Sequence, residues 1–161
     1  MPRRAGAAPR RNRSTHVVGL HIAAGRLAMA DDEQNLSPAA EAPWLVATRA
    51  DAVPEGGAVV VQPPDGEPVA IFRHERRLSA VTNLCAHQNG PLGEGRAVDG
   101  CITCLWHCFQ YRLADGCASP PFTEKLATYR LRLEGGQVLL HSRPNPPGTF
   151  VEPLALPESV A

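Results

Sequence analysis

Two short motifs that each pair a cysteine with a histidine place the strongest constraint on how this chain can fold. Cys85-x-His87 and Cys104-x-x-His107 each supply one thiol and one imidazole, and residues 88–103 separate them. Thiolates and imidazoles are both good donors to transition metals. Because the two pairs stand far apart in the chain, they can share one centre only where the fold brings them together. The sequence therefore predicts two loops that meet at a metal centre.

The sequence around these motifs predicts short strands and turns. The expected strands cover residues 58–62, 68–74, 77–83 and 127–134, and a closing hairpin strand begins at Gln137. Turn-forming residues separate them, and residues 127–134 alternate apolar and polar side chains, as a half-buried strand does. No ten-residue stretch of this region has helical periodicity. We expect an all-β domain at about residues 44–142 with an irregular tail on each side.

The two tails have different compositions. Residues 1–43 are basic and alanine-rich, so we expect a poorly ordered N-terminal extension. Residues 143–161 are proline-rich and are expected to run extended over the surface as a C-terminal tail. An export signal within residues 1–30 is an alternative, although His21 and Arg26 interrupt its weak apolar run. A start site at Met29 is another.

Overall composition excludes several classes of partner. The chain has 161 residues and a formal net charge of zero, which supports neither nucleic-acid binding nor attachment to an anionic membrane. No apolar run approaches the ~18 residues that cross a bilayer. Four of the five cysteines lie within residues 101–117, which suits metal binding in a reducing compartment better than a disulfide framework. We therefore expect a cytoplasmic protein with no membrane span and no nucleic-acid partner.

The two motifs and their surroundings resemble the Rieske iron–sulfur family over about residues 44–142. The resemblance implies a Rieske-type antiparallel β domain in which two loops form a small cluster-binding subdomain that holds one 2Fe–2S cluster. Cys85 and Cys104 would bind one iron, and His87 and His107 would bind the other. The further matching residues are Pro91, Leu92 and Gly95 in the first loop, Trp106 before the second histidine, Tyr111 to Gly116 after it, and Pro120 and Pro121 in a proline loop.

Two positions depart from the family's pattern. The family usually has proline after the second-loop cysteine and glycine after the second histidine, whereas this chain has Leu105 and Cys108. Glycine lets the backbone approach the cluster because it lacks a side chain, so we expect Cys108 to make the cluster fragile. The residues that the resemblance places around the four ligands are Leu92, Trp106, Cys108, Phe109, Tyr111 and Pro120.

The residues around the sulfurs also predict a low reduction potential. Hydrogen bonds to cluster sulfurs stabilise the reduced form and raise the potential. Phe109 stands where high-potential members have a hydroxyl donor, and Tyr111 stands where a second donor would sit. The inter-loop disulfide of those members has no counterpart, because its positions are Gly90 and Trp106. We expect a potential near the bottom of the Rieske range of roughly −150 to +300 mV.

The resemblance implies an electron-transfer component rather than a catalyst by itself. Ring-hydroxylating oxygenases carry a further iron domain, and only a short segment follows residue 142. Respiratory Rieske proteins need a membrane anchor. The chain is most similar in kind to the small soluble Rieske ferredoxins, which carry electrons from a flavin reductase to an oxygenase or similar acceptor.

Other functions stay open on the sequence alone. A regulatory subunit, like the small subunit of assimilatory nitrite reductase, shares the fold but often lacks the ligands. An accessory Rieske subunit of a larger membrane reductase is another possibility. A zinc-binding module would use Cys101, Cys104, His107 and Cys108, but it would leave the first motif without a role.

Overall fold

Antiparallel strands make up nearly all the regular structure of residues 43–158, the part of the chain that the computed structural model describes. The expected N-terminal extension, the export signal and the alternative start at Met29 lie outside the described residues. The elements are β1 Trp44–Arg49, η1 Ala50–Ala52, β2 Ala58–Val61, β3 Val69–His74, β4 Arg77–Thr82, η2 Leu92–Glu94, β5 Ala97–Val98, β6 Cys101–Thr103, β7 Gln110–Arg112, β8 Thr128–Tyr129, β9 Leu131–Glu134, β10 Gln137–His141 and β11 Leu154–Ala155.

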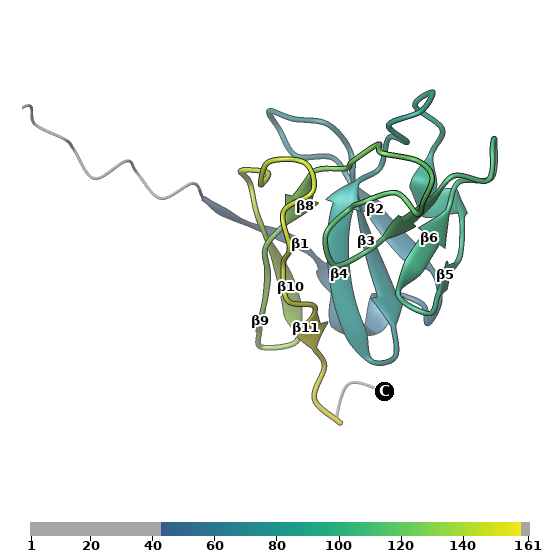
Figure 1. The fold of residues 1–161 in the computed structure, drawn as a ribbon. Helices are drawn as coiled ribbons and strands as arrows, with labels where there is room; N and C mark the ends of the chain where they lie inside the picture. The colour runs from purple at the N-terminus through teal and green to yellow at the C-terminus, as the bar shows by residue number, and fades with distance from the viewer. Residues whose placement is uncertain (1–42, 159–161) are drawn as a thin grey trace, which may run out of the picture. The chain divides into compact units, whose positions relative to one another are not determined.

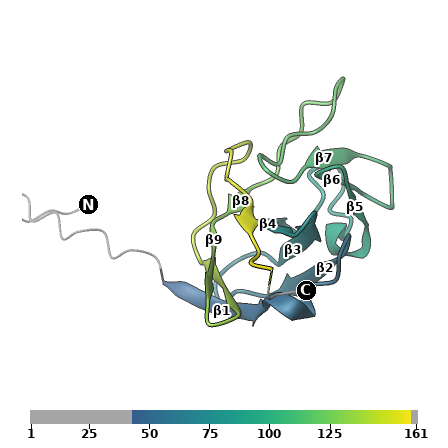
Figure 2. The same ribbon diagram turned by 90° about the horizontal axis from the view of Figure 1, so that it is seen from below.

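The strands form three sheets. The central sheet has the order β11-β4-β3-β2, and β8 also pairs with β4. A second sheet has the order β1-β10-β9, and a third has the order β5-β6-β7. Figures 1 and 2 show β3 and β4 between the other two sheets. The described residues contain eleven strands and two short 3-10 turns, and every pairing between these strands is antiparallel. The prediction of an antiparallel all-β domain is confirmed.

Strand β3 is buried on both faces and supplies two hydrophobic cores. Successive side chains of a strand point to opposite faces. Val69 and Ile71 therefore enter a core shared with the sheet β1-β10-β9, which we call the base core. Ala70 and Phe72 enter a core shared with the sheet β5-β6-β7, which we call the tip core. The apolar run of β3 thus holds the two halves of the domain together.

The two cores differ in their side chains. The base core consists of Ala50, Val53, Val69, Ile71, Leu78, Ala80, Tyr129, Val138, Leu140 and Leu156. The tip core consists of Ala70, Phe72, Val81, Cys85, Leu92, Ala97, Ile102, Cys104, Phe109, Tyr111, Leu113, Ala118 and Leu126. Only the tip core contains cysteines, and both of them belong to the predicted motifs.

The strand predicted over residues 127–134 is divided in the structure. Strand β8 pairs with β4 of the central sheet, and β9 pairs with β10 of the second sheet. Tyr129, Leu131 and Leu133 point toward the base core as predicted. Thr128 belongs to the polar side of the predicted alternation, but it is buried in the structure, and its hydroxyl donates to the Thr149 carbonyl at 2.9 Å. The C-terminal segment covers it.

Residues 143–158 include a turn at Pro147 and Gly148 as well as extended backbone, and they are hydrogen-bonded to the domain. Leu154 and Ala155 pair with β4, and Leu156 is buried in the base core. The Val151 amide donates to the Ala114 carbonyl at 2.8 Å. The packed part of the chain therefore extends beyond the boundary that the sequence suggested. No helix within residues 43–158 is long and apolar enough to cross a membrane.

Candidate metal centre

The two predicted loops close with the same backbone hydrogen bonds. In the first loop, the Cys85 amide donates to the Gly90 carbonyl at 2.9 Å, and the Asn89 amide donates to the Cys85 carbonyl at 2.7 Å. In the second loop, the Cys104 amide donates to Phe109 at 2.8 Å, and the Cys108 amide donates to Cys104 at 2.9 Å. Each loop thus turns back five residues after its cysteine.

The fourth residue after each cysteine has a left-handed backbone. Asn89 has a φ of 58° and Cys108 has a φ of 60°. Asparagine tolerates this conformation, whereas most other side chains are strained in it. The structure thus supplies a second reason for the glycine that the family favours at position 108. The Cys108 side chain itself is exposed. The cost of having cysteine in place of glycine therefore lies in the strained backbone and not in a buried side chain.

Side-chain and backbone bonds anchor the first loop to the central sheet. The Gly93 amide donates to Asn83 Oδ1 at 2.7 Å, and the Leu92 amide donates to the Asn83 carbonyl at 2.8 Å. Leu84 and Pro91 pair across the base of the loop. Leu92 is fully buried in the tip core, directly below the loop. These contacts hold the first motif at the end of β4.

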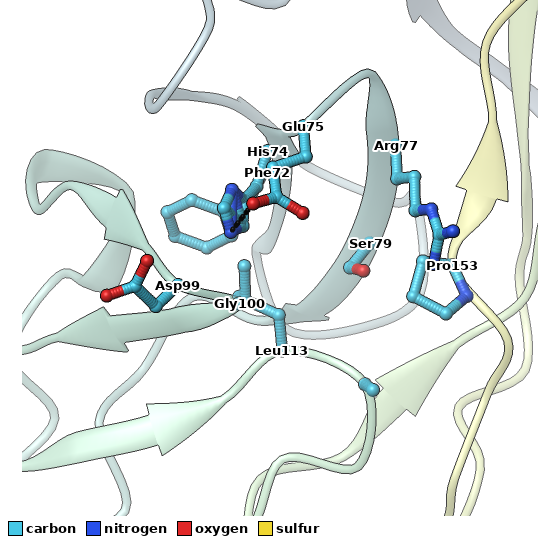
Figure 3. A pocket seen from close by; sticks show the side chains of 10 residues that line it. Phe72, His74, Glu75, Arg77, Ser79, Asp99, Gly100, Leu113 and Pro153 are labelled. Carbon is cyan, nitrogen blue, oxygen red and sulfur yellow. Dashed lines mark ion pairs between the residues drawn. The ribbon is translucent and has the colours of Figure 1, made fainter.

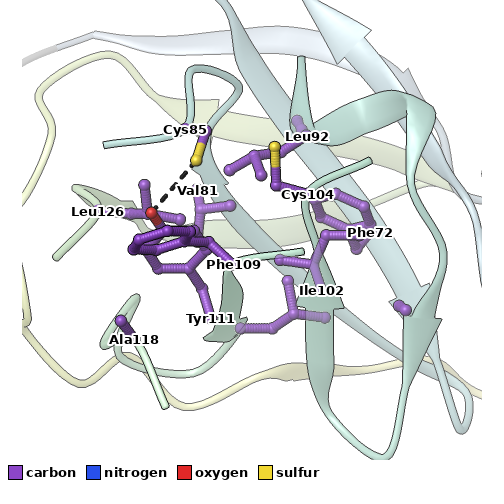
Figure 4. Packing of buried hydrophobic residues seen from close by; sticks show 13 residues of the cluster. Phe72, Val81, Cys85, Leu92, Ile102, Cys104, Phe109, Tyr111, Ala118 and Leu126 are labelled. Carbon is purple, nitrogen blue, oxygen red and sulfur yellow. Dashed lines mark hydrogen bonds between the residues drawn. The ribbon is translucent and has the colours of Figure 1, made fainter. Parts of the chain in front are cut away.

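The thiols of the two motifs are buried side by side. Figure 4 shows the sulfurs of Cys85 and Cys104 at the same end of the tip core. The Tyr111 hydroxyl lies 3.2 Å from Cys85 Sγ. Burial raises the pKa of Tyr111 above its ordinary value, and the neighbouring Cys85 raises it further. The hydroxyl therefore stays protonated and is able to donate to a Cys85 thiolate.

Cys104 has different partners from Cys85. Burial raises the pKa of its thiol, backbone amides of Trp106 and His107 lower it, and the neighbouring Cys85 thiol raises it. The backbone of the second loop thus favours the charged form of the Cys104 thiol, whereas burial opposes it. Gly90 lies against the same sulfur: a Cβ at this position would stand 2.9 Å from Cys104 Sγ and 3.1 Å from the Trp106 ring. Only a residue without a side chain fits between the loops here.

The two imidazoles also meet. The rings of His87 and His107 have centroids 4.7 Å apart and planes at 84°. His107 is exposed and His87 is half-buried. His87 Nδ1 is buried and has no hydrogen-bond partner among the described residues. A buried ring nitrogen without a partner is costly, unless a ligand that the protein normally holds satisfies it.

This arrangement suits a 2Fe–2S cluster of the Rieske type. Such a cluster takes two thiolates on one iron and two imidazoles on the other, so each iron needs only two protein ligands. The structure pairs thiol with thiol and imidazole with imidazole. Among residues 43–158, no three His, Cys, Asp or Glu side chains gather around one point. The unpartnered His87 Nδ1 is a donor that such a group would use, and Gly90 lets the two loops approach each other closely.

The side chains of the zinc alternative are not brought together. Cys101 lies on β6 opposite Arg112, where burial raises the pKa of its thiol and Arg112 lowers it. The Cys117 sulfur faces the Asp115 carbonyl at 3.9 Å. The structure therefore places Cys101 with the Arg112 and Asp115 side chains rather than with Cys104.

Aromatic residues near the loops have unequal roles. Phe109 is buried and stacks on His87, with ring centroids 4.2 Å apart. Trp106 is largely exposed beside Gly90. In the proline loop, Pro120 is exposed, and Phe122 is the residue whose ring contacts Phe109 at 4.2 Å. Neither the contact of Phe122 nor the packing role of Gly90 was predicted from the sequence. The lone aromatic residue in a proline-rich loop was the available signal for Phe122.

A shallow depression of about 360 Å³ lies away from the two motifs (Figure 3). Its lining comes from Phe72, His74, Glu75, Arg77, Ser79, Asp99, Gly100, Leu113, Ala114 and Pro153. His74 Nε2 and Glu75 Oε1 are 4.0 Å apart within it. None of the four motif residues lines it, so it is separate from the candidate metal centre.

Comparison with known proteins agrees with this geometry. Residues 43–130 match the family model for the Rieske [2Fe-2S] domain. The chain is 34% identical over 79 residues to the ferredoxin component of an alkene monooxygenase system of Xanthobacter autotrophicus, covering 48% of this chain and 65% of that one, just under two thirds of its length. It is 36% identical over 92 residues to the biphenyl dioxygenase ferredoxin subunit of a Pseudomonas species, covering 56% of this chain and 84% of that one.

Among solved structures, a ferredoxin of Sphingomonas yanoikuyae B1 has the same fold. It superposes with a TM-score of 0.58 at 25% identity, covering 62% of this chain and 98% of that chain. The family match spans more than half of this chain and includes both loops. The cofactor of that family is a 2Fe–2S cluster. The chain belongs to the Rieske [2Fe-2S] domain family.

Proposed function

We propose that this protein is a Rieske-type ferredoxin that binds one 2Fe–2S cluster and transfers single electrons between redox proteins. Cys85 and Cys104 hold one iron, and His87 and His107 hold the other. The observation that carries the proposal is that two loops with the same backbone closure place their two thiols beside each other and their two imidazoles in contact. The cluster, when bound, accepts and releases one electron at a time.

The surrounding residues set the conditions for that electron. Tyr111 is placed to donate a hydrogen bond to the Cys85 sulfur, and the backbone at Trp106 and His107 lowers the pKa of the Cys104 thiol against the effect of burial. Phe109 supplies no hydroxyl, so one donor of the high-potential members is missing. We propose a midpoint potential near the bottom of the range of roughly −150 to +300 mV. A midpoint well above zero in protein-film voltammetry would contradict this.

The exposed tip is suited to contact with another protein. Leu105 and Trp106 on the second loop and Phe122 on the proline loop are exposed apolar side chains next to the motifs. Two of the similar proteins are ferredoxin components of a monooxygenase and a dioxygenase system. We propose an oxygenase, or a similar enzyme, as the acceptor, and a flavin reductase as the donor. The donor is oxidised and the acceptor reduced by one electron in each exchange.

Metal and sulfide analysis of the anaerobically purified protein tests the cofactor. About two irons and two acid-labile sulfides per chain are expected, together with the EPR spectrum of a reduced Rieske centre. His107→Ala should abolish that spectrum. His74→Ala, which changes a histidine away from the loops, should leave it intact. Stoichiometric zinc without sulfide in the parent protein would reject the proposal.

We also propose that the protein works in a reducing compartment, as in the cytoplasm. No disulfide joins the cysteines of residues 43–158, and Cys108 is an exposed thiol next to a proposed ligand. Such a thiol is readily oxidised where the surroundings are oxidising. Recovery of the mature protein from the periplasmic fraction of its host would contradict this location.

A further inference from the structure

The two histidines of the candidate centre have unequal surroundings. His87 stacks face to face on Phe109, with centroids 4.2 Å apart and planes at 11°. Phe122 lies 4.2 Å from the same Phe109 ring, with planes at 36°. Two rings cannot occupy one face of a third ring at these separations, so Phe109 lies between His87 and Phe122. The exposed His107 touches His87 edge-on and has no stacked partner among the described aromatic rings.

The three stacked rings come from three separate segments. His87 belongs to the first loop, Phe109 ends the second loop, and Phe122 belongs to the proline loop. The proline loop is tied to the strand that follows Phe109, since the Ser119 amide donates to the Gln110 carbonyl at 2.8 Å. The Ser119 hydroxyl also donates to Gln110 Oε1 at 3.1 Å. These bonds fix Phe122 relative to Phe109.

Burial along the stack decreases outward. Phe109 is 8% exposed, whereas Phe122 is 46% exposed and covers the outer face of Phe109. Phe122 therefore acts on His87 through Phe109 and not by direct contact. A stacked ring restricts rotation of the imidazole and excludes water from the covered face. His107 has neither restriction.

We propose that Phe109 and Phe122 are positioning residues that fix and shield His87, so that His107 is the imidazole that presents an open edge to solvent and to a redox partner. This inference rests on the proposed function, in which both histidines bind iron. It assigns different tasks to them. His87 holds the cluster in a fixed orientation, and His107 is the point of approach.

Chemical labelling of the full-length holoprotein tests the assignment. Diethyl pyrocarbonate transfers an ethoxycarbonyl group to a free imidazole nitrogen and releases ethanol and carbon dioxide. Peptide mass spectrometry then gives the labelling rate of each histidine. In the parent protein, His107 should react about three- to tenfold faster than His87, as expected when a stacked contact must open first. Equal rates at the two histidines would overturn the inference.

Variants of the stack sharpen the test. Phe109→Leu keeps an apolar side chain but removes the ring, so the two rates should approach each other. Phe109→Tyr keeps the ring and should keep the protection of His87. Circular dichroism and iron content of each variant report whether it is folded and loaded. A role of Phe109 in packing alone predicts the same ratio of rates in all folded variants, which would contradict the inference.

A surface variant provides a second test that does not depend on whether Phe109→Leu folds. Phe122→Ala removes an exposed ring and should raise His87 labelling by a smaller factor. Phe150→Ala is the matched control, because Phe150 is a similarly exposed phenylalanine with no stacked partner among the described residues. Adding Phe122→Ala to Phe109→Leu should have no further effect. If Phe122→Ala leaves His87 labelling unchanged, the stack does not shield it.

The outcome is separable from that of the proposed function. Iron and sulfide analysis of the parent protein decides whether the cluster is present. A parent protein without cluster would reject the proposed function, while the ratio of labelling rates in that same protein would still report whether the stack protects His87. A loaded parent protein with equal rates would reject the stack alone.

Discussion

The two loops of the candidate centre have the same backbone closure but different surroundings. In each loop a cysteine amide is bonded five residues ahead, and the residue at the fourth position has a left-handed backbone. The first loop satisfies that conformation with Asn89, whereas the second uses Cys108. The Tyr111 hydroxyl lies beside the sulfur of the first loop, whereas the pKa of the second-loop thiol, Cys104, is lowered by the backbone of Trp106 and His107.

The difference shows that backbone closure and electronic surroundings are set separately. Closure depends on residues within five positions of each cysteine. The surroundings depend on side chains that come from β7, the proline loop and the opposite loop. Changes to ligands should therefore affect both loops alike, whereas changes to their surroundings should affect one loop at a time.

Removal of either thiol should have the largest effect. Cys85→Ala and Cys104→Ala should each abolish the 2Fe–2S absorption, because each leaves one iron with a single protein ligand. The base core contains neither residue, so far-UV circular dichroism should still report a folded β domain. Cys117→Ala is the matched control and should keep the cluster. A loaded Cys85→Ala protein would remove the first loop from the ligand set.

Gly90→Ala should have the next largest effect. The added Cβ would stand 2.9 Å from Cys104 Sγ and 3.1 Å from the Trp106 ring, so the loops must separate. We expect a loss of about 1–3 kcal/mol in unfolding free energy and a lower iron content. Gly66→Ala is the control, since its nearest neighbour is Pro63 Cβ at 3.8 Å. Denaturant unfolding compares the stabilities of the Gly90→Ala and Gly66→Ala variants. Equal stabilities would show that the loops can separate without a cost in free energy.

Tyr111→Phe should change the potential more than the stability. It removes the hydroxyl that lies 3.2 Å from Cys85 Sγ. A net hydrogen bond is worth about 1 kcal/mol, which for one electron corresponds to about 40 mV. Because the bond favours the reduced form, the midpoint should fall by this amount. Tyr129→Phe changes a tyrosine of the base core and should leave the potential unchanged in voltammetry.

Cys108→Gly should have the smallest effect and the opposite sign. Glycine adopts the left-handed backbone without strain, so the variant should gain up to about 1 kcal/mol in unfolding free energy. It should also keep its cluster longer in air, because an exposed thiol beside a ligand is removed. Asn89→Gly places glycine at the same position of the first loop. Its gain in unfolding free energy should be smaller, because asparagine tolerates the left-handed backbone. A larger gain from Asn89→Gly would contradict this comparison.

Much of the fold was predictable from local patterns. The expected strands at residues 58–62, 68–74 and 77–83 correspond to β2, β3 and β4 to within one residue at each end. Turn residues and alternation act over a few positions, so they are visible in the sequence. The division of residues 127–134 between β8 and β9 was not visible, because it depends on which sheet each half meets.

The two loops of the candidate site were predictable, and the residues that surround them were less so. The spacing of Cys85, His87, Cys104 and His107 is a local feature. The structure places the two thiols beside each other and the two imidazoles in contact. Tyr111 was placed by the resemblance and does face a motif sulfur. The tie between the C-terminal segment and the domain, and the approach of Phe122 to Phe109, join residues far apart in the chain.

The sequence by itself predicted the central strands β2, β3 and β4, the two loops and four candidate donor side chains, since each depends on neighbours within a few residues. Only the tertiary structure decided that the thiols are buried in the tip core, that Gly90 must lack a side chain and that His87 is stacked while His107 is open. Which side chains pack against a remote segment depends on the position of that segment in the folded chain. Local sequence patterns cannot predict this position, because burial is a property of the assembled chain.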